Sequence, residues 1–362
     1  MIKILYIIDS LKAGGKERQL VELIKGLNNH QKFIIEICVM NKRVHYTEVE
    51  NLNIKIHYLI RSSKKDIRIF SKIYFICKNF SPDIIHTWDT MTAFYSLPIA
   101  KLLKIKIIDG SIRNATGMNI LSWRYFHSRI LSHYFDKVIS NSKAGLDAYN
   151  INSNKGSFIY NGFDQKRIQN LSSKKEIINK FGIKNKIVIG MVASFTPKKD
   201  WFTFINCAQE ILSIRDDLIF MGVGDGPIFE EIKTYSDKFL GESIILLKNY
   251  HPIEDLINVF HIGVLTTNSK YHKEGISNSI MEYMALGKPT IATNSGGNIE
   301  LIVHNDTGFL INKNDVQGLK KRILYLSDNS ELLISMGNSS KKRIKKYFSN
   351  ESMINNYINI YK

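Results

Sequence analysis

The sequence predicts an α/β protein made of two doubly wound domains, each with a parallel sheet covered by helices on both faces. Three observations predict this fold. The chain has 362 residues, which exceeds the size at which a single hydrophobic core usually stops growing. Short apolar runs, typical of strands buried on both faces, alternate with segments of helical periodicity. This rhythm stops in a polar, lysine-rich stretch after residue 164 and starts again at Lys186.

The first half opens with a strand, a glycine turn and a helix. Residues 2–8 are almost continuously apolar, residues 9–16 form a turn that contains Gly14-Gly15, and residues 17–27 repeat leucine and isoleucine at helical spacing. This order indicates a βαβ unit. The further strands expected in this half cover residues 33–40, 84–86, 105–108 and 137–140.

The second half repeats the pattern. Lys186 precedes the apolar run IVIGMVASF, which predicts a strand, and a helix over 201–214 and a strand over 217–223 follow. Further strands are expected at 244–247, 262–266, 290–293 and 309–311. We therefore expect an N-terminal domain over 1–164, a linker over 165–185, a C-terminal domain over 186–340, and a helix over 341–362 that packs back on the first domain.

Composition limits the class of protein. The formal net charge is +17, and residues 1–164 hold 24 Lys and Arg against 13 Asp and Glu, so an anionic partner is expected. No apolar run approaches the roughly 18 residues that span a bilayer, and the first residues read as a strand, not a signal peptide. The odd cysteine count and the absence of CxxC predict buried packing residues in a reducing, cytoplasmic compartment, at Cys38, Cys77 and Cys207.

The segment EGISNSIMEYMALGKP carries the strongest chemical signal. Ser277 is a suitable N-cap and Gly287 a suitable helix terminator, so a helix is expected over 278–286. The backbone N–H groups at its start can hold a diphosphate. Glu282 lies about 7 Å further along, within reach of a ribose, and Glu274 lies before the helix, near a sugar. The competing interpretation is a capped surface helix with two solvated acids.

Residues 274–311 closely resemble the donor-site signature of glycosyltransferase family 4. The shared landmarks are two glutamates eight positions apart, a Gly-x-Pro strand and a Gly-Gly turn with a following glutamate: Glu274, Glu282, Gly287, Pro289, Gly296, Gly297 and Glu300. The resemblance covers essentially the whole chain. It implies two Rossmann-like domains facing across a cleft (the GT-B arrangement), an acceptor-binding N-terminal domain, a nucleotide-sugar-binding C-terminal domain, and a retaining reaction without a metal or other cofactor.

The resemblance also assigns donor-binding residues. The Gly14-Gly15 loop would meet the donor phosphates, and the loop over 197–200 would carry the phosphate-binding Lys199. Ser194 stands where the family usually has an arginine, which removes one cation unless Lys198 or Arg18 compensates. The turn over 223–227 lies near the nucleotide, and the turn over 161–164 is structural. The donor-binding residues expected are Gly14, Gly15, Arg18, Lys199, Gly224, Glu274, Gly275, Ile276, Ser277, Asn278 and Glu282.

The acceptor side departs from the family pattern. The stretch over 108–114 lacks the usual histidine near Ser111, so Arg113 is expected to bind there and to act with Glu274 and Lys199 in catalysis. Asp109 could meet an acceptor hydroxyl. His86 and Trp88 follow an earlier strand and could face the cleft, although a lone histidine often packs or orients.

Residues 119–135 place Trp123, Phe126, Ile130 and Tyr134 on one helical face, with Arg124 and Arg129 on its flanks. One interpretation is a helix that docks on anionic lipid, and the other is a helix that faces the core. The positive excess of the first half favours the lipid interpretation.

The predicted activity is therefore transfer of a hexose or N-acetylhexosamine from a nucleotide diphosphate sugar, with a UDP-sugar favoured, to a saccharide acceptor. The acceptor is expected to be lipid-linked, in biosynthesis of a surface polysaccharide such as capsule or O-antigen, with the enzyme peripheral on the inner face of the membrane. No metal is expected, as the resemblance implies, and the absence of an Asp-x-Asp pair, the usual carrier of a donor-bound divalent ion, fits this. The alternatives are a GT-B sugar-nucleotide epimerase, which lacks the spaced glutamates, and a basic nucleic-acid-binding protein, for which no motif is present.

Overall fold

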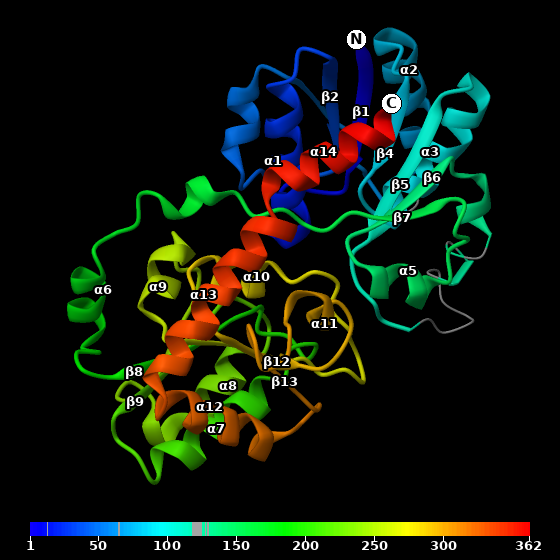
Figure 1. Ribbon diagram of the computed structural model, residues 1–362. Coiled ribbons are helices and arrows are strands. Elements are labelled where there is room, and N and C mark those ends of the chain that lie inside the picture. The colour runs from blue at the N-terminus through cyan, green and yellow to red at the C-terminus, as the bar shows by residue number, and fades with distance from the viewer. Residues whose placement is uncertain (13, 64–65, 118–124, 127, 129) are drawn as a thin grey trace. The chain divides into compact units, whose positions relative to one another are not determined.

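The computed structural model describes residues 1–12, 14–63, 66–117, 125–126, 128 and 130–362, which form two compact units (Figure 1). Unit 1 comprises Met1–Gly162 and Asn350–Lys362, and unit 2 comprises Phe163–Ser349. The predicted linker, residues 165–185, lies within unit 2, where it contains η3 (Gln165–Ile168) and α6 (Lys174–Phe181). The chain thus passes between the units twice, and both termini belong to unit 1.

Unit 1 holds a parallel sheet in the strand order β3-β2-β1-β4-β5-β6-β7. Its central strands are buried on both faces because their residues are apolar at successive positions, as in β1. The edge strands β3 and β7 were not expected from the sequence; both are short and partly exposed, so they lack a continuous apolar run. The strands are β1 (Ile2–Ile8), β2 (Phe33–Val39), β3 (Lys55–Tyr58), β4 (Ile84–Thr87), β5 (Lys106–Ile112), β6 (Lys137–Ser140) and β7 (Gly156–Phe158).

Helices cover both faces of this sheet. Ile4 and Tyr6 of β1 point into a core with α1 and α14, whereas Leu5 and Ile7 point into a second core with α2 and α3. Asp89 begins α3 by accepting hydrogen bonds from the backbone N–H groups of the first turn. The helices of unit 1 are α1 (Gly15–Asn28), η1 (Thr47–Leu52), α2 (Arg68–Phe80), α3 (Thr90–Leu103), η2 (Leu131–Tyr134), α5 (Lys143–Tyr149) and α14 (Asn350–Tyr361).

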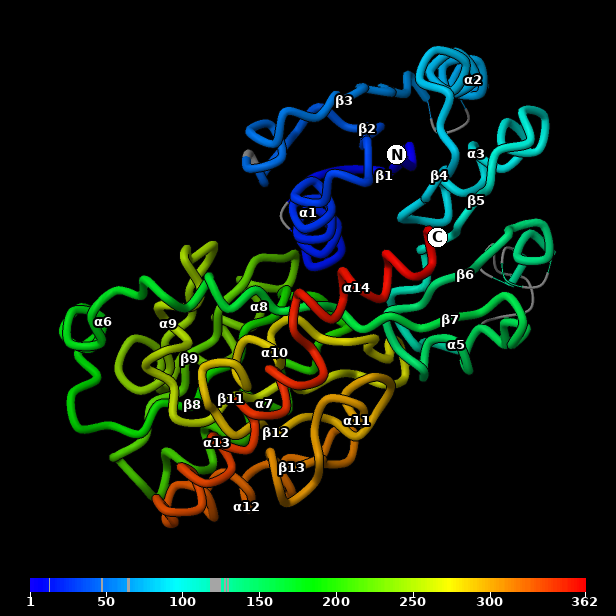
Figure 2. The backbone as a smooth tube through the Cα atoms, turned by 45° about the horizontal axis from the view of Figure 1, so that its top comes forward, coloured from blue at the N-terminus to red at the C-terminus, as the bar shows by residue number. Residues whose placement is uncertain are grey.

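The C-terminal segment differs from the prediction of one helix over 341–362. It forms two helices, α13 (Ser330–Tyr347) in unit 2 and α14 in unit 1. Helix α14 lies beside α1 in both Figure 1 and Figure 2. The approach is close: a Cβ atom on Gly26 would lie 2.0 Å from Ile354 Cδ1. The absence of a side chain at this position of α1 therefore allows α14 to pack against it.

Unit 2 holds a parallel sheet in the order β10-β9-β8-β11-β12-β13, the doubly wound arrangement that places the first and fourth strands side by side. Val188 and Met221 face a core with α6 and α9, and α7 and α12 pack together on the opposite face. The strands are β8 (Ile187–Val192), β9 (Leu218–Val223), β10 (Ile244–Leu247), β11 (Ile262–Leu265), β12 (Thr290–Thr293) and β13 (Gly308–Ile311). The other helices are α7 (Trp201–Leu212), α8 (Phe229–Tyr235), η4 (Asp237–Phe239), α9 (Ile253–Val259), α10 (Asn278–Ala285), α11 (Asn298–Leu301) and α12 (Val316–Ser327).

Each sheet has one point at which the strand order reverses. In unit 1 this point lies between β1 and β4, and in unit 2 it lies between β8 and β11. Loops that leave the carboxyl ends of such strands form the usual ligand-binding crevice of an open α/β sheet. The chain places the Gly14-Gly15 turn after β1, Trp88 after β4, Lys199 after β8 and Glu274 after β11. The predicted site residues therefore follow the strands that flank these two points.

Candidate active site

Lys199 and Glu274 form an ion pair at the strand-order reversal of unit 2. Lys199 lies on the loop between β8 and α7, which pairs with the end of the β11 strand through a bridge to Thr267. Glu274 lies on the loop that leads from β11 into α10. Both side chains are largely buried, at 15% and 11% exposure. The structure thus brings together two residues that the family resemblance assigns to the donor site.

The environment of Glu274 keeps its carboxylate ionised. Thr267 donates a hydrogen bond of 3.3 Å to Oε1, and His272 Nε2 lies 3.5 Å from Oε2. Burial alone would raise the pKa of Glu274, but the Lys199 ammonium and His272 outweigh burial and hold the pKa well below its usual range. The site therefore carries a fixed negative charge paired to a cation beside the start of α10.

The backbone of the Gly296-Gly297 turn packs against the backbone of the loop that carries Glu274. The Gly297 amide donates a 2.8 Å hydrogen bond to the Glu274 carbonyl oxygen. Gly296 has a φ of +56°, and a Cβ atom there would lie 2.2 Å from the same oxygen. A Cβ atom on Gly297 would lie 2.3 Å from the Gly275 carbonyl oxygen. Only glycine fits this close backbone approach, so the turn fixes the position of Glu274 and Gly275.

Helix α10 begins as the sequence predicts, but Ser277 does not cap it with its side chain. Ser277 occupies the N-cap position in an extended conformation, and its hydroxyl lies 3.1 Å from that of Ser279 without a hydrogen bond to a helix N–H group. The first turn of a helix presents backbone N–H groups that intrahelical bonds do not use. Gly275, Ile276 and Asn278 thus belong to a loop and helix start that can meet an anion through the backbone.

Glu282 is held by a residue that the sequence did not single out. Arg167 Nη2 donates to Glu282 Oε1 over 2.7 Å and also contacts Glu254 on α9. Glu282 is 3% exposed and Arg167 17% exposed. The contact joins residues 115 positions apart and leaves no local pattern, so sequence periodicity could not have found it. The turn over 161–164, which we expected to be only structural, leads directly into η3, the short helix that carries Arg167.

The turn after β9 lies against the loop that carries Lys199. A Cβ atom on Gly224 would lie 1.9 Å from the Ala193 carbonyl oxygen, and the Phe195 amide bonds to the Asp225 carbonyl oxygen over 2.9 Å. Ser194, which stands where the family pattern has an arginine, is exposed and accepts a 3.0 Å bond from Trp201 Nε1 at its backbone oxygen. Gly224 therefore allows two loops at the carboxyl edge of the sheet to meet.

In unit 1 the Gly14-Gly15 turn leads directly into α1. The Gly14 carbonyl oxygen accepts a 3.0 Å hydrogen bond from the Tyr46 hydroxyl, and Arg18 lies 6.0 Å from the centre of the Tyr46 ring. Lys16 on the same turn of helix forms a 2.6 Å ion pair with Asp9. These contacts fix the entrance of α1 and place Arg18 in its first turn.

His86, Trp88 and Arg113 form one cluster in unit 1. The Arg113 guanidinium lies 3.9 Å from the centre of the Trp88 ring. His86 is fully buried and pairs through Nδ1 with the Tyr361 hydroxyl over 2.7 Å. Burial, together with Arg113, lowers the pKa of His86 well below its usual value, so the ring is neutral. Among the described residues, no hydrogen-bond partner meets His86 Nε2 or Arg113 Nε and Nη2, although these atoms are buried.

The other predicted acceptor-side residues are not exposed. Trp88 is 1% exposed and donates through Nε1 to the Lys16 carbonyl oxygen over 2.9 Å. Asp109 is fully buried and accepts hydrogen bonds from the Ser111 amide and hydroxyl, at 3.0 and 3.1 Å. Only Arg113 of this group is partly exposed. His86 and Trp88, which we expected could face the cleft, are thus buried in the described structure, and the alternative of a packing or orienting histidine describes His86.

The segment proposed to dock on lipid is only partly described. Trp123, Arg124 and Arg129 lie outside the described residues. Phe126, Ile130 and Tyr134 are 37%, 48% and 56% exposed. In the described part of the chain, no helix combines the length and the apolar character needed to cross a membrane.

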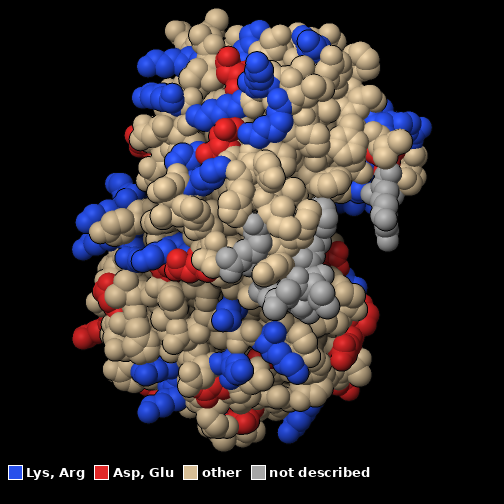
Figure 3. Space-filling view, turned by 90° about the vertical axis from the view of Figure 1, so that its right-hand side faces the viewer, with Lys and Arg blue, Asp and Glu red and all other residues tan. Residues whose placement is uncertain are grey.

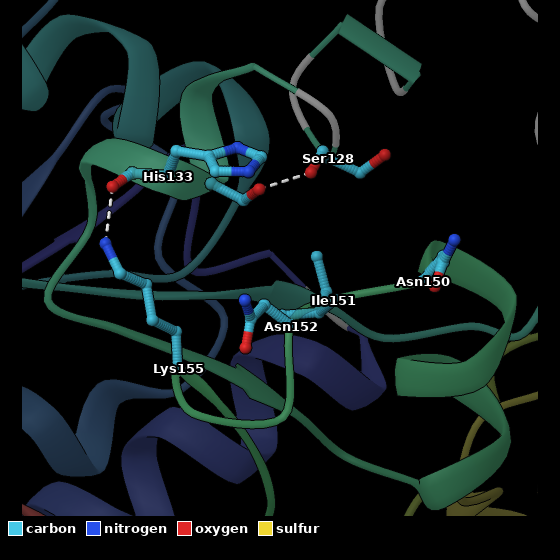
Figure 4. Close-up of a pocket in the computed structure, with 7 residues that line it drawn as sticks. Ser128, His133, Asn150, Ile151, Asn152 and Lys155 are labelled. Atoms are coloured by element: carbon cyan, nitrogen blue, oxygen red, sulfur yellow. Dashed lines mark hydrogen bonds between the residues drawn. The ribbon is translucent and has the colours of Figure 1, made fainter.

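A hollow of about 260 Å³ lies beside this segment, and its lining includes Ser128, His133 and Asn152 (Figure 4). Lys155, which also lines the hollow, donates to the backbone oxygens of His133 and Phe135, the latter at 3.0 Å. The lysine is thus held by the protein itself. Within the described ranges, no group of three or more His, Cys, Asp or Glu residues is arranged to hold a metal ion.

Charged side chains of both signs are interspersed on one face of the protein. On the face shown in Figure 3, lysine and arginine side chains occur in several separate groups with acidic side chains among them. On this face, the charged side chains do not form a single continuous basic patch.

Comparison with known proteins covers both units. A family model for Glycosyltransferase Family 4 matches residues 13–167, and one for Glycosyl transferases group 1 matches residues 173–343. An uncharacterized glycosyltransferase of Methanocaldococcus jannaschii is 28% identical over 83% of each chain. An Escherichia coli protein named UDP-Gal:alpha-D-GlcNAc-diphosphoundecaprenol alpha-1,3-galactosyltransferase is 24% identical over 78% of this chain and 76% of its own.

Solved structures share the fold. The structure of Anabaena HepE in complex with UDP-glucose matches with a TM-score of 0.84 at 18% identity, over 99% of each chain. A glycosyltransferase from Rickettsia africae matches with a TM-score of 0.85 at 22% identity, over 100% of this chain and 98% of its own. At these identities the likeness concerns the fold alone.

Proposed function

This chain is a glycosyltransferase of the GT-B fold, related to family 4 through its first half and to group 1 through its second, and we propose that it transfers a hexose or N-acetylhexosamine from a UDP-sugar to a saccharide acceptor. Support for a uridine nucleotide comes from the relatives: the E. coli protein is named for UDP-Gal, and the Anabaena protein holds UDP-glucose. Support for the chemistry comes from the contacts within unit 2.

The observation that carries the proposal is the Lys199–Glu274 ion pair beside the start of α10. When the sugar leaves, negative charge develops on the donor diphosphate. A fixed ammonium and the backbone N–H groups of a helix start stabilise such charge without reorganising. Lys199 would meet the diphosphate, and Glu274 would orient Lys199 and accept from sugar hydroxyls.

Glu282 is proposed to hold the ribose. A carboxylate accepts well from a pair of vicinal hydroxyls, and α10 carries both the anion-binding start and this acid. Ile276 and Gly224 would shape the surface against which the nucleotide lies. A Glu282→Ala variant that binds the nucleotide as the wild type does would contradict this role.

We further propose retention at the anomeric carbon and independence of a metal ion. The helix start and Lys199 would supply the positive potential that a divalent cation supplies elsewhere. Proton NMR of the glycoside product should show an α linkage from an α-configured donor, and a β linkage would contradict retention. Loss of turnover on addition of a chelator, restored by a divalent cation, would contradict metal independence.

The acceptor is proposed to be a lipid-linked saccharide used for a surface polysaccharide, met at the inner face of the membrane. The positive excess of residues 1–164 supports an anionic acceptor or surface, and the E. coli relative is named for a diphosphoundecaprenol-linked sugar. In unit 1 the partly exposed Arg113 would meet the acceptor. The buried His86, Trp88 and Asp109 would hold the Arg113 side chain in place. Arg113→Gln should raise the acceptor KM with little change in the donor KM; an unchanged acceptor KM would contradict the assignment.

A panel of nucleotide sugars tests the function as a whole. The protein would be incubated with each donor, with and without a lipid-linked N-acetylglucosamine acceptor, and the products separated by mass. Transfer from a UDP-sugar to the acceptor is expected. Conversion of the nucleotide sugar to an isomer without an acceptor would instead show an epimerase, and transfer only from a purine nucleotide sugar would overturn the UDP assignment.

A further inference from the structure

Arg167 joins two acidic side chains from two different helices. One of its nitrogens, Nη2, contacts Oε1 of Glu282 on α10 and Oε1 of Glu254 on α9. The two glutamates are 3% and 8% exposed, so their charges are largely removed from water, and the guanidinium lies against both of them.

The segment that carries Arg167 is itself fixed within unit 2. The guanidinium lies 4.9 Å from the centre of the Phe163 ring, and Phe163 is 1% exposed. The Phe163 amide donates a 2.8 Å hydrogen bond to the Phe348 carbonyl oxygen. Further along, the Ser172 amide donates to Asp255 on α9 over 2.9 Å. Arg167 therefore approaches the glutamates from a rigid base, which a surface arginine would not have.

The geometry points to Arg167 as a positioning residue for Glu282, so that Glu282 presents its carboxylate to the ribose of the donor in one orientation. This inference rests on the proposed ribose-binding role of Glu282. A carboxylate is planar, so a bond to one oxygen from a fixed guanidinium also sets the direction of the other oxygen. Glu254 in turn holds the guanidinium from the side of α9. The segment after the 161–164 turn thereby becomes part of the nucleotide site.

A merely structural ion pair would behave differently from a positioning one. Loss of a structural contact lowers stability and weakens every ligand by a similar factor. Loss of a positioning contact weakens the binding of those ligands that use Glu282. It also removes the gain in affinity that the ribose hydroxyls give over the deoxy nucleotides. Comparison of UDP with 2′-deoxy-UDP and 3′-deoxy-UDP therefore separates the two roles.

The experiment is a calorimetric titration of these three nucleotides into the full-length wild type, R167M and the matched control R322M. Arg322 is partly buried and lies 4.4 Å from the Phe309 ring, so its replacement also removes a guanidinium stacked on an aromatic ring. We expect R167M to bind UDP at least 10-fold more weakly and to discriminate against the deoxy nucleotides less than 3-fold, with R322M like the wild type. Discrimination at the wild-type level in R167M would overturn the inference, whether UDP binding is weakened or not.

Two further variants complete the test. R167M leaves two buried carboxylates facing each other, so R167M/E254M, which removes that repulsion, serves if R167M does not fold. The double variant should also fail to discriminate between UDP and the deoxy nucleotides. Discrimination at the wild-type level in the double variant would overturn the inference. E282A separates the inference from the function on which it rests. If E282A keeps full discrimination, both the ribose role and the inference fail; if E282A loses it while R167M keeps it, only the inference fails.

Discussion

The Lys199 ammonium contacts the Glu274 carboxylate across 75 positions of sequence, on two loops that leave neighbouring strands of one parallel sheet. The contact depends on the strand order, because β8 and β11 lie side by side although β9 and β10 come between them in the chain. A cation and an acid placed at this edge stand next to the start of α10. The fold thus assembles the proposed phosphate-binding group from segments that are far apart in sequence.

The Glu274 carboxylate should make the stability of the protein sensitive to acid. Its pKa in the folded state lies well below its usual value, because Lys199 and His272 outweigh burial. A lowered folded pKa stabilises the fold above the ordinary pKa of a glutamate, and this contribution is lost as the pH falls. The difference in unfolding free energy between the wild type and E274Q, from urea titrations, should therefore be largest above about pH 5 and should shrink toward pH 3.

The exposed Glu210–Lys320 pair, at 3.0 Å, gives a matched control for this measurement. Glu210 is 40% exposed at its side chain, so solvent and salt screen the pair. E210Q should change the pH dependence much less than E274Q. Equal pH profiles for wild type and E274Q would show that the buried pair contributes no linked stability.

Lys288 should make the protein more stable as the pH rises above neutrality. Burial, with Lys174 and Lys341 nearby, lowers the pKa of Lys288 to about 7. Between that value and the ordinary lysine pKa, the unfolded chain binds a proton that the folded chain does not, so stability rises by at most about 1.4 kcal/mol per pH unit. Thermal unfolding from pH 7 to pH 9.5 should show this rise in the wild type and not in K288M. A parallel rise in both proteins would rule out Lys288 as its source.

Gly296 should be less replaceable than Gly182, although both adopt a left-handed φ, +56° and +64°. An alanine at either position carries the cost of that conformation, about 1–2 kcal/mol. At Gly296 the new Cβ would also press on the Glu274 carbonyl oxygen, whereas nothing lies within 4 Å at Gly182. G296A should lose roughly 1–3 kcal/mol more stability than G182A, and it alone should weaken nucleotide binding. Similar stability and binding in the two variants would contradict a role for this close approach.

The sequence is sufficient for much of the fold because its signals are local. The continuous apolar runs of β1 and β8 and the helix over 278–286 depend on neighbouring residues. The structure has β1 at the expected bounds and α10 one residue shorter, whereas β8 ends at Val192, three residues before the end of the expected strand. The edge strands β3 and β7 escape detection because they are short and half exposed. The break between α13 and α14 is also hidden, since no glycine or proline marks it.

The site could be predicted only in part. The family resemblance assigns Lys199 and Glu274 to one site, and the structure places their side chains in contact. The arginine that holds Glu282 was missed because an ion pair between distant segments leaves no periodic trace. The burial of His86, Trp88 and Asp109 could not be read from the sequence either, because a polar residue at a strand end can face a crevice or the core equally well.

Titration of UDP and a UDP-sugar into wild type, K199M and K320M tests the proposed donor site most directly. Lys320 also forms an ion pair with a glutamate, Glu210, but Lys320 lies on α12 and not on a loop that leaves β8 or β11. We expect K199M to bind both ligands at least 10-fold more weakly and to transfer sugar about 100-fold more slowly, while K320M resembles the wild type. Wild-type affinity and turnover in K199M would contradict the proposal that Lys199 meets the donor diphosphate.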